Sequence, residues 1–297
     1  MTSAPALNDW QASVAGIITG VDTPFEFVEI LGWHDLPAID SNAAPRPRAH
    51  GNFSSDEFAR SRTITLVLEA AQDSSDSLAS RLDDLRTALP PAGSEDPIEV
   101  WVKLPGEVAK LARCKPRRLH NPIDTLYEHG VTQVRVVLRA DDGRKYGEDI
   151  VASTSFPSPS GGLEFDLFTD GAGTALAYLD FGEASADGKV TVANDGNAEI
   201  SCVFAVSGPI PSEGFLIREQ GGDAYLRYEA SVPSGSVLTL DGVEGDCLLD
   251  GVADRSANLT FHRWPVIPAR SAAVFVFESL GAATAASLSV TSASAWW

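Results

Sequence analysis

Short apolar runs closed by turn residues recur through the second half of the chain. The series is clearest in residues 189–251, where Val190, Val192, Val237 and similar residues stand in runs that end at Gly, Asn, Asp or Pro. Runs of this length, rich in β-branched residues, are typical of strands in an antiparallel sheet. Residues 194–197, Asn-Asp-Gly-Asn, tolerate positive φ and predict a hairpin between the runs on either side.

The first half combines strands with one helix. Residues 73–89 place four leucines at intervals of four, three and four, on one helical face, behind several polar N-cap candidates. Two prolines at 90–91 end the pattern. Runs at 62–70, 98–104 and 131–140 are strand-like. We therefore predict a helix that packs on a sheet through Leu78, Leu82, Leu85 and Leu89.

These patterns predict a mainly β protein of two domains. Residues 1–154 are expected to form an α+β domain, a β-sandwich or split barrel with one helix. Residues 155–297 are expected to form an antiparallel β-sandwich, with a further hairpin across residues 221–223. Residues 151–162, rich in Ser, Pro and Gly, are interpreted as a linker. A chain of 297 residues is long enough for each domain to bury its own core.

The chain carries a formal net charge of −19, which is shared unevenly. Residues 1–150 hold 16 basic and 23 acidic side chains, whereas residues 151–297 hold 6 and 18. Nucleic-acid binding requires clustered Lys and Arg, so no specific nucleic-acid binding is expected. The one basic cluster lacks interleaved aromatic residues, which favours ion pairing with an acidic neighbour over phosphate binding. It comprises Arg113, Lys115, Arg117 and Arg118.

No pattern points to catalysis, a cofactor or a metal. Cys114, Cys202 and Cys247 are widely separated, which favours buried thiols over a disulfide framework or a zinc site. The histidines have no metal-ligand spacing, and nucleophile-elbow, zinc-protease and Walker motifs are absent. We therefore expect a non-enzymatic protein without cofactors. With no signal sequence and no apolar run of about 20 residues, it is expected to be made in the cytoplasm without membrane insertion.

Residues 37–52 form a basic loop punctuated by prolines. A segment of this length and polarity is not buried without partners. We expect it to dock on a neighbouring subunit, and a solvated loop is the alternative. Arginines in and after the loop would pair with acidic side chains of the next subunit in a head-to-tail ring. The candidate interface residues are Arg46, Arg48, His50, Arg60 and Arg62.

Several short motifs follow one another along the chain in a fixed order. They are R-A-H-G at 48–51, R-T-I-T-L at 62–66, S-G-G-L-E-F-D-L at 160–167, V-A-N-D-G-N-A-E at 192–199, V-S-G-P-I at 206–210, G-S-V-L-T-L-D at 235–241 and L-L-D-G at 248–251, with tryptophan at the C-terminus. Their collinear order resembles the siphophage distal tail protein family, a hub component of the phage tail tip or baseplate.

The resemblance implies a galectin-like C-terminal sandwich and a structural role in a virion. It implies a homo-hexameric ring at the distal end of the tail tube, in contact with the tail tube protein, the tape measure protein and tail-tip or hub proteins that meet the host. The protein would be assembled in the host cytoplasm and reside at the virion tail tip. DNA would pass through the channel of the ring, and an acidic lumen would keep the duplex from sticking. Solubility of the chain is the alternative explanation of its acidity.

A second interpretation is a carbohydrate-binding β-sandwich module for glycans of the host surface. The second domain of the family is similar to galectin-like and other sugar-binding folds, and sugar sites use exposed aromatic platforms. Most of the aromatic residues in the second half sit within strand patterns, which favours the core. The candidates are Tyr178, Tyr225, Tyr228, Trp264, Trp296 and Trp297.

Overall fold

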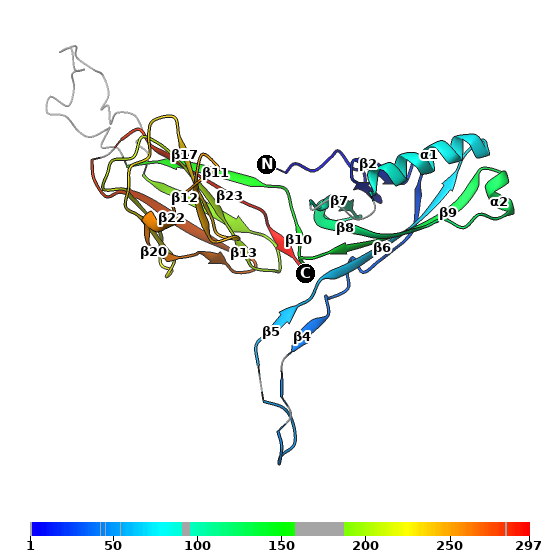
Figure 1. Cartoon of the computed structure of the whole chain (residues 1–297), viewed down its shortest axis with the longest axis horizontal. Helices are drawn as coiled ribbons and strands as arrows, with labels where there is room; N and C mark the ends of the chain where they lie inside the picture. The colour runs from blue at the N-terminus through cyan, green and yellow to red at the C-terminus, as the bar shows by residue number, and fades with distance from the viewer. Residues whose placement is uncertain are drawn as a thin grey trace, which may run out of the picture. The chain divides into compact units, whose positions relative to one another are not determined.

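The computed structural model describes residues 2–41, 43–44, 46–53, 55–90, 96–157, 187–282 and 284–297 (Figure 1). The chain forms two compact units, one of Met1–Asp149 with Ser294–Trp297 and the other of Ile150–Ala293. Strands dominate both units, and the described residues include one long helix. The predicted mainly β fold class is confirmed. The motif at 160–167 lies outside the described residues.

The first unit is built on an open antiparallel sheet with the strand order β2-β1-β7-β8-β9-β6-β3. Two short strands, β10 and β24, pair with each other beside β8. The sheet contains β1 (Gln11–Val14), β2 (Ile17–Gly20), β3 (Glu26–Leu31), β6 (Arg62–Ala71), β7 (Ile98–Lys103), β8 (Lys110–His120), β9 (Val131–Ala140), β10 (Lys145–Tyr146) and β24 (Ala295–Trp296). The long strands β6 and β9 pair in register over their whole length and form the longest strand pair of the unit.

Helix α1 (Ser75–Ala88) lies against one face of this sheet (Figure 1). The side chain of Ser74 caps its N-terminus by accepting a hydrogen bond from the backbone of Ser77. Leu78, Leu82 and Leu85 are buried in one cluster with the apolar side chains of the sheet. The predicted helix and its leucine stripe are therefore confirmed. A second helix, α2 (Thr125–Glu128), precedes β9.

The second unit contains two larger antiparallel sheets. Their strand orders are β11-β23-β14-β17-β18-β19 and β12-β22-β15-β16-β20. The first contains β11 (Ile150–Ser155), β14 (Val203–Ser207), β17 (Val237–Asp241), β18 (Asp246–Leu249), β19 (Ala253–Asp254) and β23 (Ser287–Ser292). The second contains β12 (Lys189–Asn194), β15 (Phe215–Glu219), β16 (Tyr225–Tyr228), β20 (Leu259–Arg263) and β22 (Ser271–Ser279). The hairpin expected across residues 221–223 is confirmed, since β15 pairs with β16.

Aromatic side chains from the two sheets meet in the core of this unit. Phe204 of β14 contacts Phe275 of β22 edge to face, with ring centroids 5.2 Å apart. Phe156, which follows β11, stacks on Phe277 of β22 at 4.1 Å. Two sheets whose apolar faces pack in this way form a β-sandwich. The predicted antiparallel sandwich is thus confirmed.

The hairpin predicted across residues 194–197 is wrong. β12 pairs with β22, and the chain after the turn enters β13 (Ile200–Ser201) and then β14, which belong to other sheets. Asn194 is buried, and its side-chain nitrogen Nδ2 donates to the backbone oxygens of Ala198, Ile267 and Pro268. Asn194 therefore holds a corner between layers. Turn residues serve a corner and a hairpin equally well, so the local sequence does not separate the two.

The expected domain boundaries also need correction. The interpretation of residues 151–162 as a linker is wrong in its first part, because β11 pairs along its whole length with β23. The Ser and Thr residues of β11 are compatible with an edge strand that has one solvent-exposed face, as well as with a linker. The last residues, Ser294–Trp297, belong to the first unit, where β24 pairs with β10. The first unit thus takes up both ends of the chain.

We expect residues 150–293 to fold cooperatively as a separate fragment, because this fragment keeps both sheets. A fragment of residues 163–293 lacks β11 and Phe156, so Phe277 loses its stacking partner. Loss of a buried phenylalanine contact costs about 3–5 kcal/mol. Thermal unfolding followed by circular dichroism should give a midpoint at least about 10 °C lower for the shorter fragment. Equal midpoints would show that β11 adds nothing to the sandwich.

Candidate functional site

A two-stranded arm, residues 36–61, projects from the sheet of the first unit (Figure 1). Its strands are β4 (Ile39–Ser41) and β5 (Glu57–Ala59), which pair in antiparallel register. Backbone hydrogen bonds continue toward the tip, from the nitrogen of Phe53 to the oxygen of Ala44 and from the nitrogen of Arg46 to the oxygen of Gly51. The docking loop expected from the sequence is thus the distal part of a ribbon.

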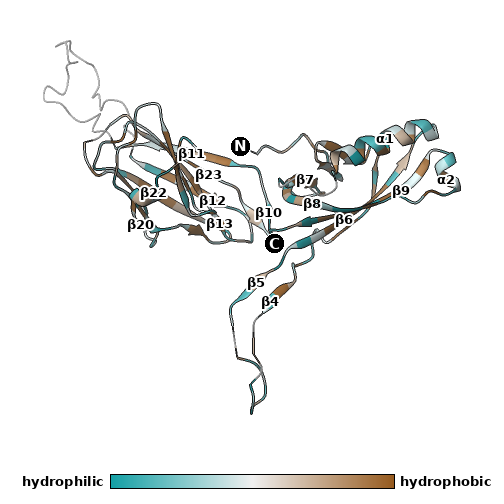
Figure 2. Cartoon of the chain, viewed as in Figure 1, coloured by the Kyte–Doolittle hydropathy of each residue, from teal (hydrophilic) through white to brown (hydrophobic). Residues whose placement is uncertain are grey.

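The arm exposes apolar side chains along its length. Every residue of β4 and β5 is exposed, and the hydropathy colouring shows an apolar stretch on β4 (Figure 2). A two-stranded ribbon is marginally stable in water, and exposed apolar groups on such a ribbon indicate a contact surface. The large apolar side chains that are more than half exposed here are Leu36, Ile39, Phe53 and Phe58.

Three of the predicted interface residues lie together at the tip of the arm. Arg46, Arg48 and His50 are all exposed. The guanidinium of Arg46 lies over the ring of Phe53, 5.4 Å from its centroid. The tip therefore presents an aromatic ring beside positive charge. This arrangement suits an acidic surface with room for an apolar side chain.

The other two predicted residues act within the chain. Arg60 pairs across the ribbon with Asp40 at 2.6 Å, an exposed ion pair of small energetic value. Arg62 is only 3 % exposed, and its guanidinium donates to the backbone oxygens of Gly143, Gly32, Trp33 and Asp35. The structure thus removes Arg62 from the set of residues that are free to contact another subunit.

A second buried cation, Lys145, meets Arg62 at the root of the arm. The Lys145 ammonium donates to the backbone oxygen of Trp33 at 2.7 Å and lies 5.5 Å from the centroid of its ring. Burial, reinforced by the nearby Arg62, lowers the pKa of Lys145 to about 8. Burial also lowers the pKa of Arg62. The segment that leads into the arm is therefore held by hydrogen bonds from two buried cationic side chains, Arg62 and Lys145.

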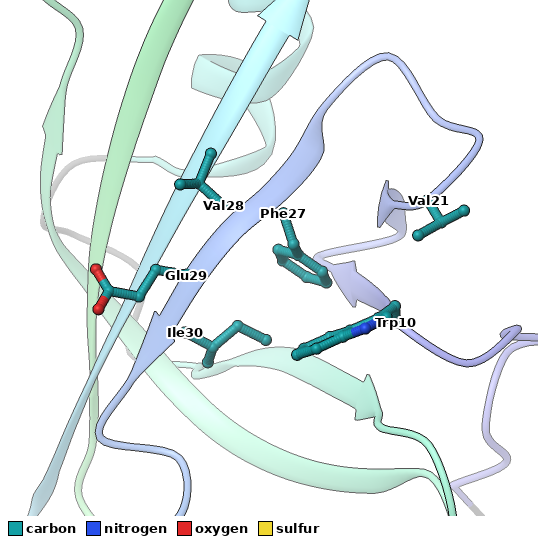
Figure 3. Close-up of a pocket in the computed structure, with 6 residues that line it drawn as sticks. All are labelled: Trp10, Val21, Phe27, Val28, Glu29 and Ile30. Carbon is teal, nitrogen blue, oxygen red and sulfur yellow. The ribbon is translucent and has the colours of Figure 1, made fainter.

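A groove lies on the same unit, beside the edge strand β3. It encloses about 200 Å³ and is lined by Trp10, Val21, Phe27, Val28, Glu29 and Ile30. Phe27 and Ile30 point toward the indole of Trp10, whereas the carboxylate of Glu29 points away from them (Figure 3). Phe27 and Ile30 thus face Trp10 across the groove, whereas Val28 and Glu29 point away from Trp10.

Comparison with known proteins found no matching family model and no matching curated protein. A solved structure of the Dit protein of phage SPP1, described as a paradigm of the hub adsorption apparatus in Gram-positive infecting phages, matches with a TM-score of 0.65 and 11% identity, over 97% of this chain and 99% of that chain. This chain has the fold of a siphophage hub protein. The resemblance in the order of sequence motifs is confirmed at the level of the fold.

A structure of the phage P2 baseplate in its activated conformation with Ca also matches, with a TM-score of 0.48 and 12% identity, over 91% of this chain and 98% of that chain.

Within this hub fold, the cysteines are interior residues as predicted. Cys114, Cys202 and Cys247 are buried free thiols, and burial raises the pKa of each to about 12. Among the described residues, no group of three or more His, Cys, Asp or Glu side chains is arranged to hold a metal. No described helix has the length and apolar character to cross a membrane.

In the structure, the basic cluster at residues 113–118 is joined by cationic side chains from a neighbouring strand. Lys115 of β8 faces Arg139 of β9, and both pair with Asp141, at 3.5 Å and 3.3 Å. Arg135 lies opposite His120 on the same two strands. The long-range pairing of β8 with β9 thus adds cations that the sequence cluster did not contain. Ion pairing of this cluster with an acidic neighbour stays a prediction.

The aromatic residues considered for a sugar platform are divided between the two units. Tyr228 is buried, and Trp296 pairs with Lys145 in the first unit. Tyr225 makes an edge contact with the exposed ring of Phe261. Tyr178 lies outside the described residues. Tyr225 pairs with Arg263, next to Trp264, whereas Trp296 and Trp297 belong to the first unit. Sugar binding stays a prediction that a glycan array tests.

Sequence reasoning missed Trp10, Trp33 and Lys145. Trp10 stands in a short polar segment and Lys145 in a turn-like stretch after Asp-Asp-Gly-Arg, so neither belongs to a periodic pattern. Their roles arise from partners far away in the sequence, such as the 112-residue separation between Lys145 and Trp33. The one available signal was for Trp10 and Trp33, since each is a tryptophan outside any strand pattern, whereas no signal pointed to Lys145.

Lys145 makes the stability of the first unit dependent on pH. Its folded pKa of about 8 lies below the unfolded value of about 10.4, so its burial destabilises the fold at neutral pH. This cost is relieved as the pH rises from 8 toward 10.4. Between pH 7.5 and 9.5, the native chain should gain about 2 kcal/mol relative to Lys145→Met. Urea unfolding at the two pH values measures this difference, and equal pH slopes would show that Lys145 does not titrate there.

Proposed function

We propose that this chain is a structural, non-enzymatic protein of a siphophage tail. It assembles into a homo-hexameric ring at the distal end of the tail tube, connects the tube to tail-tip or host-recognition proteins, and leaves a channel for DNA. Its partners in this role are the tail tube protein, the tape measure protein and a tip or hub protein. The support is a fold shared with phage SPP1 Dit over 97% of the chain, together with the projecting arm.

The single observation that carries the proposal is the exposed arm. A monomer gains nothing from a ribbon that shows Leu36, Ile39, Phe53 and Phe58 to water, because burial of such side chains is worth about 1.5–3 kcal/mol each. An arm on one side of a subunit that grips another side of the next makes a heterologous contact. Repeated by rotation, that contact closes a ring.

Reversal of the charges at the tip should weaken the ring. The double variant Arg46→Glu and Arg48→Glu replaces attraction to acidic side chains of the next subunit with repulsion, and we expect the association constant to fall at least about tenfold. Multi-angle light scattering of the purified full-length chain, read over a range of concentrations, measures the loss.

The matched control is Arg255→Glu with Arg270→Glu, which makes the same charge change on exposed residues of the second unit. This variant should keep the association of the native chain. If both variants weaken association equally, net charge rather than the arm controls assembly.

The channel of the ring should have a negative inner surface. A wall of like charge prevents the phosphate contacts that release counterions and hold DNA. Because the screening length is about 8 Å at physiological salt, only side chains near the wall act on the duplex. Negative-stain images should show a ring with a central hole, and the purified ring should not shift duplex DNA in a gel at low salt. Tight DNA binding would contradict the conduit role.

A further inference from the structure

We propose that the outer face of the β8–β9 strand pair binds an acidic surface of a different protein. The inference rests on the proposed function and names a surface through which this chain contacts one of its partner proteins. β8 carries five Lys or Arg residues, β9 carries two, and neither strand contains Asp or Glu. These seven are about a third of the 22 basic residues in a chain whose net charge is −19.

The strand pairing gathers four of these cations on the face of the sheet that points away from α1. The residues of β9 that are buried in the core with α1 are Val134, Val136, Leu138 and Ala140. Because side chains alternate between the two faces of a strand, Arg135, Val137 and Arg139 point outward. Across the strand pair, Lys115 stands opposite Arg139. Arg118 stands opposite Val137. The four outward cations, called the cationic face below, are Lys115, Arg118, Arg135 and Arg139.

A bulge in β8 keeps Arg118 on this face. The register shifts between Pro116 and Arg118, so that Arg117 is an extra residue without a partner in β9. Lys115 and Arg118 are three positions apart, and in a regular strand they would point to opposite faces. The extra residue restores the alternation, and Leu119 packs against the core instead. The bulge therefore extends the cationic face along β8.

The cationic face is only partly neutralised within the chain. Lys115 and Arg139 share the carboxylate of Asp141, at 3.5 Å and 3.3 Å. Arg118 and Arg135 are exposed and make no ion pair with a residue that the structure describes. One carboxylate thus serves two of the four cations, and the excess positive charge is available to carboxylates of a partner.

Exposed apolar side chains at the end of the strand pair favour a protein partner. The connection from β8 to β9 contains α2 (Figure 1). Its residues Ile123 and Leu126 are 80% and 54% exposed, whereas Tyr127 packs against the core and holds the connection in place. Protein interfaces combine apolar side chains with polar and charged ones. The phosphates of a nucleic acid would leave Ile123 and Leu126 uncovered.

Two further properties of the chain oppose nucleic-acid binding on this face. The net charge of −19 repels a highly charged polyanion as it approaches, whereas a protein with a local acidic patch is repelled much less. Neither β8 nor β9 contains Phe, Tyr or Trp, on which unpaired bases would stack. The observations therefore commit the cationic face to an acidic protein surface.

The spacing of the outward side chains defines a simple probe. Outward residues recur every second position of a strand, about 6.8 Å apart. An extended peptide of alternating Glu and Ser presents its carboxylates at the same interval on one side. Recognition of acidic segments by clustered arginines is a common mode of peptide binding. Such a peptide therefore represents the acidic partner in solution.

The first test measures binding of this peptide, labelled with a fluorophore, to the full-length chain at low salt by fluorescence anisotropy. Arg118→Glu with Arg135→Glu should raise the dissociation constant at least about tenfold, because repulsion replaces attraction. The matched control is Arg81→Glu with Arg86→Glu, which makes the same charge change on exposed residues of α1 in the same unit. The control should change the constant less than about threefold.

Circular dichroism confirms that both variants keep the native fold. Failure of the native chain to bind the peptide would overturn the proposal. Equal losses in the two variants would also overturn it, since net charge rather than the cationic face would then control binding.

The second test separates a protein partner from a nucleic acid. The same peptide with two leucines added at one end should bind at least about threefold more tightly, and Ile123→Ser with Leu126→Ser should remove that gain. A short DNA duplex with an equal number of charges should bind at least about tenfold more weakly than the leucine peptide. Absence of the gain, or duplex binding as tight as peptide binding, would overturn the assignment to a protein.

Sedimentation velocity separates this inference from the proposed function. Arg118→Glu with Arg135→Glu should leave self-association of the full-length chain unchanged. If this variant loses as much association as Arg46→Glu with Arg48→Glu, the cationic face meets a second copy, and the assignment to a different protein is overturned. A chain that forms the ring but does not bind the peptide overturns the inference alone. A chain that binds the peptide but stays monomeric at every concentration overturns the proposed ring and leaves the acidic preference of this face established.

Discussion

The first unit depends on a contact between two buried cations and one backbone carbonyl. Arg62 begins β6, the long strand between β9 and the edge strand β3, and Lys145 lies in β10. Both side chains donate to the backbone oxygen of Trp33. The segment before the arm lies close to β6 because residue 32 is a glycine. Its φ is +78, and a Cβ on it would lie 2.0 Å from the backbone oxygen of Thr63. This contact joins the sheet, the start of the arm and, through pairing of β10 with β24, the C-terminus.

Such a contact is costly, and its value lies in geometry. Buried cations lose hydration, and apolar replacements of similar volume are often as stable or more stable. The guanidinium of Arg62 even keeps one buried nitrogen without a hydrogen-bond partner among the described residues. Planar and multidentate, however, it binds four carbonyl oxygens at once and fixes the course of the chain into and out of the arm. For an arm that contacts a neighbouring subunit, a fixed orientation relative to the sheet matters more than the free energy that its buried cations contribute to folding.

Local patterns predicted the elements whose partners are near in sequence. The leucine stripe of α1 encodes its buried face directly, and the hairpin of β15 and β16 joins two runs across a glycine-rich turn. The same logic failed at Asn194, because a turn can lead to the next strand of one sheet or to the other layer. It failed again at β11, whose pairing partner β23 lies more than a hundred residues away. For the candidate site, sequence reasoning located the basic tip of the arm but not the groove.

The sequence by itself determined that the chain is mainly β with one long helix, that the second half forms a sandwich, and that Arg46, Arg48 and His50 occupy an exposed segment. These properties follow from periodicity, turn chemistry and the high cost of burying unpaired charge, all of which act locally. Only the tertiary structure decided that Arg62 is buried within the unit and Arg46 is a surface residue, although the sequence predicted both as interface arginines. It also brought Trp10 to β3 to form the groove. The reason is that burial and pairing depend on which distant carbonyls, carboxylates and apolar surfaces the fold brings to a side chain.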